Sequence, residues 1–316
     1  MTNLSEFTFL SSDGKTQLHG MLWEPEGVAV RAVLQICHGV AEHIARYDGF
    51  ARALNEQGIV VAGHDHLGHG KSLPEGGTPV YFGDGNTWNT VVDDIYVLHQ
   101  RLKQRYPDAP LCIMGHSMGS FLTRTYLIRY PGTVKAAVIM GTGWQPRGAI
   151  TVPPWGGPLA NPIAAVSGEN ATSELVTELA FGSYNKLFAP NRTKVDWLSA
   201  DESNVDDYIA DPLCGADATV GLFRQMLHGI RFNQRQSHLR QMDREMPVLF
   251  VAGDKDPVGS CGKGVRQTYD AFRAAGMRDC TLKLYPGLRH EILNEKAYTA
   301  DITKNIEAWL LSRLEK

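Results

Sequence analysis

The residues best suited to chemistry lie at positions 115–119, which read Gly-His-Ser-Met-Gly with Ser117 at the centre. An apolar run at 111–114 precedes them and an amphipathic stretch begins at Phe121, so the serine falls at a bend between a strand and a helix. Glycines flank such a serine because the turn is too sharp, and the neighbouring backbone too close, for side chains there. The pattern predicts a nucleophilic serine directed at a substrate.

A serine hydroxyl is a weak nucleophile near neutral pH and needs a general base, which a third group orients. On a doubly wound sheet the acid and then the histidine follow the serine along the chain. His290 is the predicted base, because it is the only histidine after His238 and follows a strand that ends at Tyr285. Asp256 is preferred to Asp254 as the acid; the other aspartate would cap the turn.

The negative oxygen of a tetrahedral intermediate requires preset donors, usually two backbone N–H groups, one of them from the residue after the nucleophile. That residue is Met118. The second donor should come from the loop that follows the strand ending at Cys37, and Val40 is the predicted donor. His38, in the same loop, could be proposed as a second base, but a structural hydrogen bond is the preferred role.

The segment 64–69 offers a different chemistry. It reads His-Asp-His-Leu-Gly-His and resembles the metal-ligand run of metallo-β-lactamase-like hydrolases, with His64, His66 and His69 as ligands. Position 68 is glycine where that run has an aspartate, and no further ligand set follows. We therefore predict a tight turn there and no metal site.

Composition excludes several functions. The 316 residues include 31 Lys+Arg and 34 Asp+Glu, dispersed along the chain, so a nucleic-acid partner is not expected. The start lacks a basic segment followed by an apolar one, and no apolar run is long enough to span a bilayer. Five scattered cysteines without a C-x-x-C pair predict free thiols in a reducing cytoplasm.

Apolar runs alternate with helical periodicities, which predicts an α/β fold with a doubly wound, mostly parallel sheet. The expected strands are 7–10, 17–23, 32–37, 59–63, 111–114, 134–140, 248–252 and 281–285. The rhythm breaks at 142–244, where helical patterns are clearest at 173–181 and 219–230. We expect a core of residues 1–141 and 245–316 and a helical cap of residues 142–244.

Apolar side chains of the cap could line an acyl pocket. Leu213 and Met226 are the predicted substrate-binding residues, although apolar stripes on helices more often pack a core. Further candidates from the same segment are Trp155, Phe181, Leu222, Phe223 and Leu227. The cap could also touch a lipid surface transiently.

These motifs together resemble the monoacylglycerol lipase and lysophospholipase branch of the α/β-hydrolases. The resemblance rests on segments spread over the core: 38–43 with Arg46 and Tyr47, 65–72, 115–119, 253–256 and 285–290. It implies a triad of Ser117, Asp256 and His290, with Val40 and Met118 as the oxyanion hole. Asp211-Pro212-Leu213 followed by a helix is similar to the segment that this family places over its acyl tunnel. Ala41 departs from the family, where many members carry glycine.

We therefore expect a cytoplasmic serine hydrolase that needs no cofactor and cleaves carboxylic esters with one apolar acyl chain. A short-chain esterase, a thioesterase or an aminopeptidase on the same fold remains open, because a triad does not determine the leaving group. A metal-dependent hydrolase and a catalytically silent binding protein are the alternatives from other classes.

Overall fold

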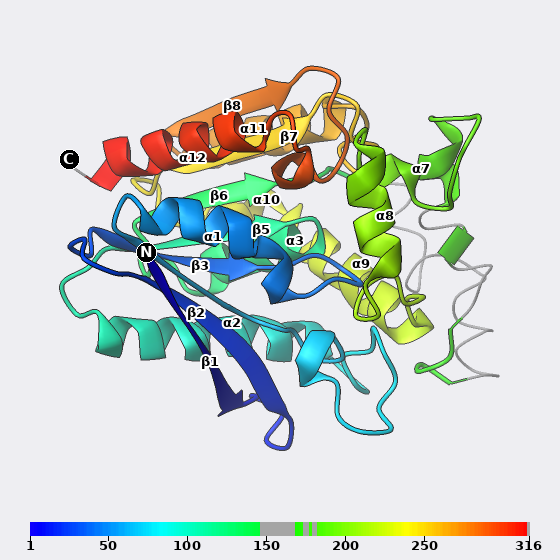
Figure 1. The fold of residues 1–316 in the computed structure, drawn as a ribbon, viewed down its shortest axis with the longest axis horizontal. Helices are drawn as coiled ribbons and strands as arrows, with labels where there is room; N and C mark the ends of the chain where they lie inside the picture. Colours follow the sequence, from blue (N-terminus) through cyan, green and yellow to red (C-terminus); the bar gives the residue numbers. More distant parts are fainter. Residues whose placement is uncertain (146–167, 173–176, 179–181, 315–316) are drawn as a thin grey trace.

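A single sheet organises the protein. The computed structural model describes residues 1–145, 168–172, 177–178 and 182–314. Within these ranges eight strands lie in the order β1-β2-β4-β3-β5-β6-β7-β8. Figure 1 shows the twisted sheet with β1 at one edge and β8 at the other. The strands are β1 (Thr2–Leu10), β2 (Gln17–Pro25), β3 (Ala32–Cys37), β4 (Ile59–His64), β5 (Leu111–His116), β6 (Ala136–Met140), β7 (Val248–Gly253) and β8 (Cys280–Tyr285). The predicted fold class is confirmed.

Strand direction divides the sheet into two parts. β1 and β2 form an antiparallel hairpin, and β2 pairs antiparallel with β4. All strands from β4 to β8 pair in parallel, so their carboxyl ends meet at one edge. The sequence predicted only 7–10 for the first strand, but β1 pairs with β2 from Thr2 onward. Most of β1 is exposed, so the added residues lack the apolar pattern that marks a strand.

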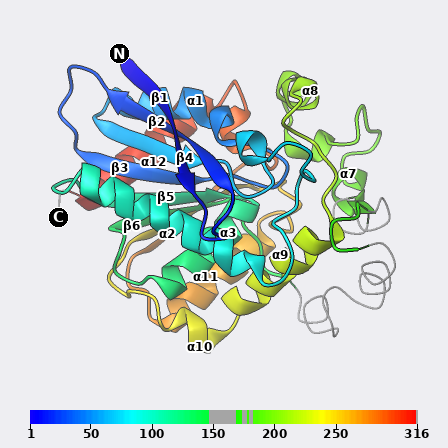
Figure 2. The ribbon, with the colours of Figure 1, turned by 90° about the horizontal axis from the view of Figure 1, so that it is seen from below.

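Helices cover both faces of the sheet. They are α1 (Asp48–Asn55), α2 (Thr87–Arg105), α3 (Met118–Arg129), α11 (Lys263–Ala275) and α12 (Thr299–Leu314). Val33 and Leu34 are consecutive in β3 and lie in separate core clusters. The Val33 cluster includes residues of α2, α3 and α11, whereas the Leu34 cluster includes residues of α1 and α12. Figure 2 shows α2, α3 and α11 together on their side of the sheet.

The described residues between β6 and β7 form helices joined by turns and irregular segments. It contains α7 (Ser183–Lys186), α8 (Glu202–Ala210), α9 (Val220–Asn233) and α10 (Gln236–Leu239). The predicted helix at 219–230 is confirmed as α9, whose first turn Thr219 caps by accepting from the Leu222 N–H. Most of the predicted helix at 173–181 lies outside the described residues. In Figure 1, α7 and α8 lie beyond the carboxyl ends of the parallel strands.

Among the helices that the structure describes, none combines the length and the apolar character that crossing a bilayer requires.

Buried histidines gather where β3 and β4 end. The His64 ring contacts Phe9 edge to face and also meets His66, and neither of its ring nitrogens has a hydrogen-bond partner among the described residues. Burial lowers the pKa of His64 and of His69 to about 3 and also lowers that of His66. These rings therefore stay neutral in the folded protein at pH 7.

Acid should destabilise the fold through these rings. The unfolded chain takes up a proton on His64 and on His69 near pH 6.5 while the folded protein does not, so each of these two rings reduces the free energy of unfolding by about 2 kcal/mol between pH 7 and pH 5. His64→Leu should remove about that much of the decrease. Urea unfolding at pH 7 and at pH 5 measures the free energy of unfolding. If the variant loses as much of it between the two pH values as wild type does, His64 is not a neutral ring in the folded protein.

Candidate active site

The bend between β5 and α3 is as sharp as its sequence predicts. Ser117 has φ 54° and ψ −122°, a left-handed backbone that a residue with a side chain adopts at a cost. A Cβ on Gly119 would lie 2.0 Å from the carbonyl oxygen of Cys37. A Cβ on Gly115 would lie 2.2 Å from the carbonyl oxygen of Gly119. Both glycines are therefore required sterically, and Ser117 is held at the carboxyl edge of the sheet.

The loops after β7 and β8 bring Asp256 and His290 together. The Nδ1 of His290 donates to Oδ1 of Asp256 over 3.0 Å, and both side chains are buried. Oδ1 also accepts from the Val258 N–H at 2.9 Å. Because a carboxylate only accepts, the neutral imidazole carries its proton on Nδ1, which leaves Nε2 as the basic nitrogen. His290 and Ser117 line the same cavity.

Asp254 has the turn-capping role. Its Oδ1 accepts from the Gly287 N–H at 2.8 Å, which joins the loop after β7 to the loop after β8. This carboxylate is partly exposed, and Asp256 is fully buried. The two aspartates therefore have different partners: Asp256 contacts His290, and Asp254 contacts the main chain of Gly287.

Val40 and Met118, the expected oxyanion donors, belong to the loop after β3 and to the start of α3. Met118 is the first residue of α3, where backbone N–H groups favour a negative charge. Val40 lines the cavity beside Ser117, and the next residue, Ala41, has φ 53°. Glycine adopts a positive φ without steric cost, whereas alanine does not. This explains why glycine suits position 41 better than the alanine found here.

Segments between β6 and β7 hold the loop that contains Val40. The carbonyl oxygen of Ala41 accepts from the hydroxyl of Tyr208 at 2.9 Å and from the N–H of Gly215 at 3.0 Å. His43 Nε2 lies 2.8 Å from Oδ2 of Asp211. The backbone around Val40 is therefore fixed from outside the sheet.

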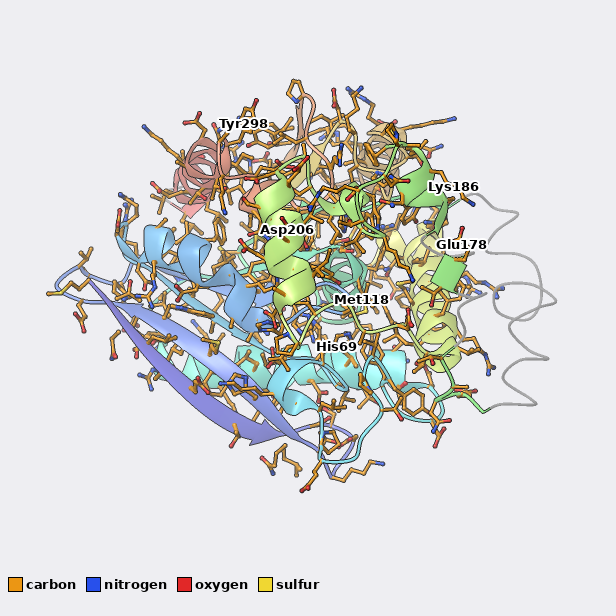
Figure 3. The ribbon with its side chains drawn as sticks, turned by 45° about the vertical axis from the view of Figure 1, so that its right-hand side comes forward. His69, Met118, Glu178, Lys186, Asp206 and Tyr298 are labelled. Carbon is orange, nitrogen blue, oxygen red and sulfur yellow. The ribbon has the colours of Figure 1, made fainter. Side chains whose placement is uncertain are left out.

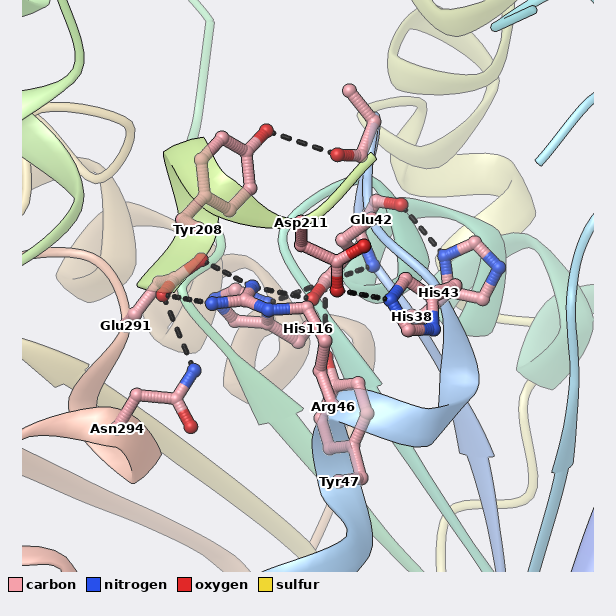
Figure 4. Close-up of polar contacts among 12 residues, drawn as sticks. His38, Glu42, His43, Arg46, Tyr47, His116, Tyr208, Asp211, Glu291 and Asn294 are labelled. Carbon is pink, nitrogen blue, oxygen red and sulfur yellow. Dashed lines mark hydrogen bonds and ion pairs between the residues drawn. The ribbon is translucent and has the colours of Figure 1, made fainter. Parts of the chain in front are cut away.

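Beneath this loop lies a buried polar cluster that the sequence analysis did not identify (Figure 4). We call it the Glu42 cluster: Glu42, Arg46, His116 and Glu291. Glu42 accepts from the Gly39 N–H at 2.5 Å, from Nδ1 of His116 at 3.1 Å and from Arg46 at 3.0 Å. Arg46 also donates two hydrogen bonds to Glu291, at 2.6 and 2.8 Å.

The charges of the cluster stabilise one another. Burial raises the pKa of Glu42, but the hydrogen bond and charge of His116 and the charge of Arg46 outweigh it and hold that pKa well below its usual range. Burial also raises the pKa of Glu291, but the charge and hydrogen bonds of Arg46 outweigh it and lower that pKa. Both carboxyl groups are therefore ionised at neutral pH.

A cavity of about 470 Å³ opens over Ser117. Its apolar lining includes Val195, Trp197, Leu198, Ala216 and Ala218. Glu42, His116 and Glu291 give it a polar side. Glu178 and Lys186, which also line the cavity and form an ion pair, lie near each other at the outer side of the protein (Figure 3).

The predicted substrate-binding residues do not line this cavity among the described residues. Met226 packs into the core, because α9 lies close against α2; a Cβ on Gly229 would fall 2.0 Å from the Trp88 indole. Leu213 is 40% exposed on the loop after α8. The described residues therefore do not support a substrate-binding role for either side chain in this cavity, and Trp155 and Phe181 lie outside the described residues.

His38 has the structural role predicted for it. Its Nδ1 donates to the Gly39 carbonyl oxygen at 2.8 Å, and its Nε2 accepts from the His66 N–H at 2.9 Å. Both ring nitrogens are engaged, which leaves none to act as a second base. The ring joins the loop after β3 to the loop after β4.

The histidine run 64–69 does not form a convergent ligand set. Of the described residues, only His43, Asp211 and Cys214 form a group of three such side chains whose ligand atoms lie within 4.8 Å of one another. His64, at the end of β4, instead packs against Phe9. This geometry speaks against the metal-dependent alternative.

Comparisons with known proteins agree on one family. The family described as "Serine aminopeptidase, S33" matches residues 28–297. The chain is 30% identical to monoacylglycerol lipase of Mycolicibacterium smegmatis over 98% of each chain. It is 28% identical to human monoglyceride lipase over 96% of this chain and 89% of that protein.

Solved structures give the same picture. A highly thermostable carboxyl esterase from Bacillus coagulans superposes with a TM-score of 0.89 at 26% identity, over 99% of this chain and 100% of that one. A structure described as a lipase in its open form superposes with a TM-score of 0.87 at 28% identity, with the same coverage.

The two aspartates should differ sharply in function. Asp256→Asn is expected to lower kcat for a p-nitrophenyl ester by roughly 10³–10⁴-fold, because asparagine can hold the histidine in the wrong tautomer. Asp254→Asn keeps an acceptor for the turn and should retain near wild-type turnover. Equal losses in the two variants, at unchanged thermal stability, would contradict this assignment.

Proposed function

The chain belongs to the α/β-hydrolase family described as "Serine aminopeptidase, S33", is related to monoacylglycerol lipases, and is a carboxylic ester hydrolase. We propose that it cleaves esters that join one apolar acyl chain to a small or polar alcohol. The observation that carries this proposal is the cavity over Ser117, which His290 also lines and which has an apolar and a polar side. An acyl chain fits the first, and an alcohol with hydroxyl groups fits the second.

The proposed mechanism uses an acyl-enzyme. His290 takes the proton of Ser117 as the hydroxyl oxygen attacks the ester carbonyl, and the N–H groups of Val40 and Met118 receive the negative oxygen. Asp256 fixes the tautomer of His290 and stabilises its charge. His290 then protonates the leaving alcohol, and water repeats the sequence on the acyl-enzyme.

We also propose that residues 142–244 act as the lid of this site and are the part of the protein that meets a lipid surface. Two contacts support this proposal. The centroids of the Trp197 and His290 rings lie 5.1 Å apart. The hydroxyl of Tyr208 and the N–H of Gly215 donate to the carbonyl oxygen of Ala41. The lid therefore contacts both the base and the loop of the proposed oxyanion hole.

The nucleophile can be tested by covalent labelling. A fluorophosphonate probe should modify wild type stoichiometrically and leave Ser117→Ala unlabelled, because only an activated serine attacks the phosphorus. Turnover of the variant should fall by several orders of magnitude, to the ~10³–10⁴-fold over water that binding and the oxyanion hole supply. Persistent active-site labelling of the variant would show that another residue is the nucleophile.

The proposed preference for an apolar acyl chain can be tested with esters of increasing acyl-chain length. Each methylene buried in the transition state contributes ~0.8 kcal/mol, about fourfold in kcat/KM, until the cavity is filled. Val195→Asn should flatten this rise at shorter chains, and Leu213→Asn, outside the cavity, is the matched control and should leave it unchanged. A wild-type series that peaks at acetate and then falls would favour a short-chain esterase.

The alternative substrate classes can be tested with the same purified protein. A thioester and an amino-acid naphthylamide, tested beside glyceryl esters, cover the thioesterase and aminopeptidase readings. Faster hydrolysis of either than of a long-chain glyceryl ester would replace the proposed substrate class.

A further inference from the structure

His116, the residue before Ser117, has an oxygen acceptor at each of its two ring nitrogens. Its Nδ1 lies 3.1 Å from a carboxylate oxygen of Glu42, and its Nε2 lies 3.3 Å from the main-chain carbonyl oxygen of His290. A carboxylate and a carbonyl can only accept. Both ring nitrogens of His116 must therefore donate, and only the imidazolium has two N–H groups.

His38 shows the contrast within the same site. One of its nitrogens faces the Gly39 carbonyl and the other faces the His66 N–H, so one must donate and the other must accept. That pattern requires a neutral ring. Burial also lowers the pKa of His38, in agreement with its partners.

The charge balance of the Glu42 cluster leads to the same conclusion. Glu42 and Glu291 are ionised, and Arg46 supplies a single positive charge, so a neutral His116 would leave one net negative charge almost fully buried. An uncompensated buried charge is strongly unfavourable. Burial opposes protonation of His116, but the hydrogen bond and charge of Glu42 prevail and raise the pKa of His116.

Among the described residues, the surroundings of the His116 ring supply no positive charge other than that of Arg46. Tyr47 donates its hydroxyl to Glu42, and Asn204 and Asn294 donate to Glu291. On the other side lies the His290 ring, 4.7 Å away between centroids, which is itself bonded to Asp256.

We propose that His116 is a positioning residue that acts as a buried imidazolium: it neutralises the Glu42 cluster and holds the main chain of His290 in place beside Ser117. The positioning role rests on the proposed function, whereas the charge state of His116 stands on its hydrogen bonds alone.

The charge state can be read without any enzyme assay. In protein labelled with ¹⁵N-histidine, the His116 ring at pH 7 should show two nitrogens that each carry a proton, and the His38 ring should show one. The variants His116→Gln, which removes the signal, and Glu42→Gln, which displaces it, provide independent assignments. An unprotonated nitrogen on His116 at pH 7 would overturn the proposal.

The positioning role can be read from the acid limb of the kcat/KM profile, which reports protonation of the base in the free enzyme. His116→Gln leaves the cluster with a net negative charge, so this limb should move to higher pH by about 1 unit. The double variant His116→Gln, Glu42→Gln restores neutrality and should move it back. An unshifted limb in a folded, active single variant would overturn the role.

Failure of the proposed function looks different from either result. Wild type that a fluorophosphonate does not label would exclude the serine mechanism, while the two protonated nitrogens of His116 would still be observed.

Discussion

The site depends on one close approach of backbone to backbone. The first turn of α3 packs against the end of β3 so tightly that Gly119 has no room for a Cβ beside the carbonyl oxygens of Cys37 and His38. This contact fixes two things together. It sets the direction in which Ser117 leaves β5, and it places the loop that follows Cys37 next to that serine, since Gly39 also lies close to the Cβ of Ser117.

The loop after β3 is held on two sides in consequence. From within, Glu42 accepts from the Gly39 N–H and belongs to a buried, charge-balanced cluster. From outside, Tyr208 and Gly215 bind the Ala41 carbonyl, at a residue whose positive φ costs free energy without glycine. These hydrogen bonds give a physical reason why alanine is tolerated there, and they couple the segment between β6 and β7 to the geometry around Val40.

Sequence reasoning located the parts of this site that local pattern and chain order determine. A strand, a glycine-flanked serine and a helix predict the bend at Ser117, and the ends of β7 and β8 place Asp256 and His290 because parallel strands end at one edge. It did not find the Glu42 cluster, whose Arg46 and Glu291 are separated by 245 residues along the chain and meet only in three dimensions. It could not decide the role of Met226, because an apolar stripe on α9 has the same pattern whether it faces a substrate or packs into the core, where Met226 lies.

The central claim is that Ser117, His290 and the two backbone donors act on one ester carbonyl. The most direct measurement is a crystal structure of the protein after reaction with a long-chain alkyl fluorophosphonate, whose adduct mimics the tetrahedral intermediate. The account predicts a bond from the Ser117 hydroxyl oxygen to phosphorus, a phosphoryl oxygen within 2.7–3.1 Å of the N–H groups of Val40 and Met118, and the alkyl chain beside Val195 and Leu198. A phosphoryl oxygen turned away from both N–H groups, or an adduct on another residue, would contradict it.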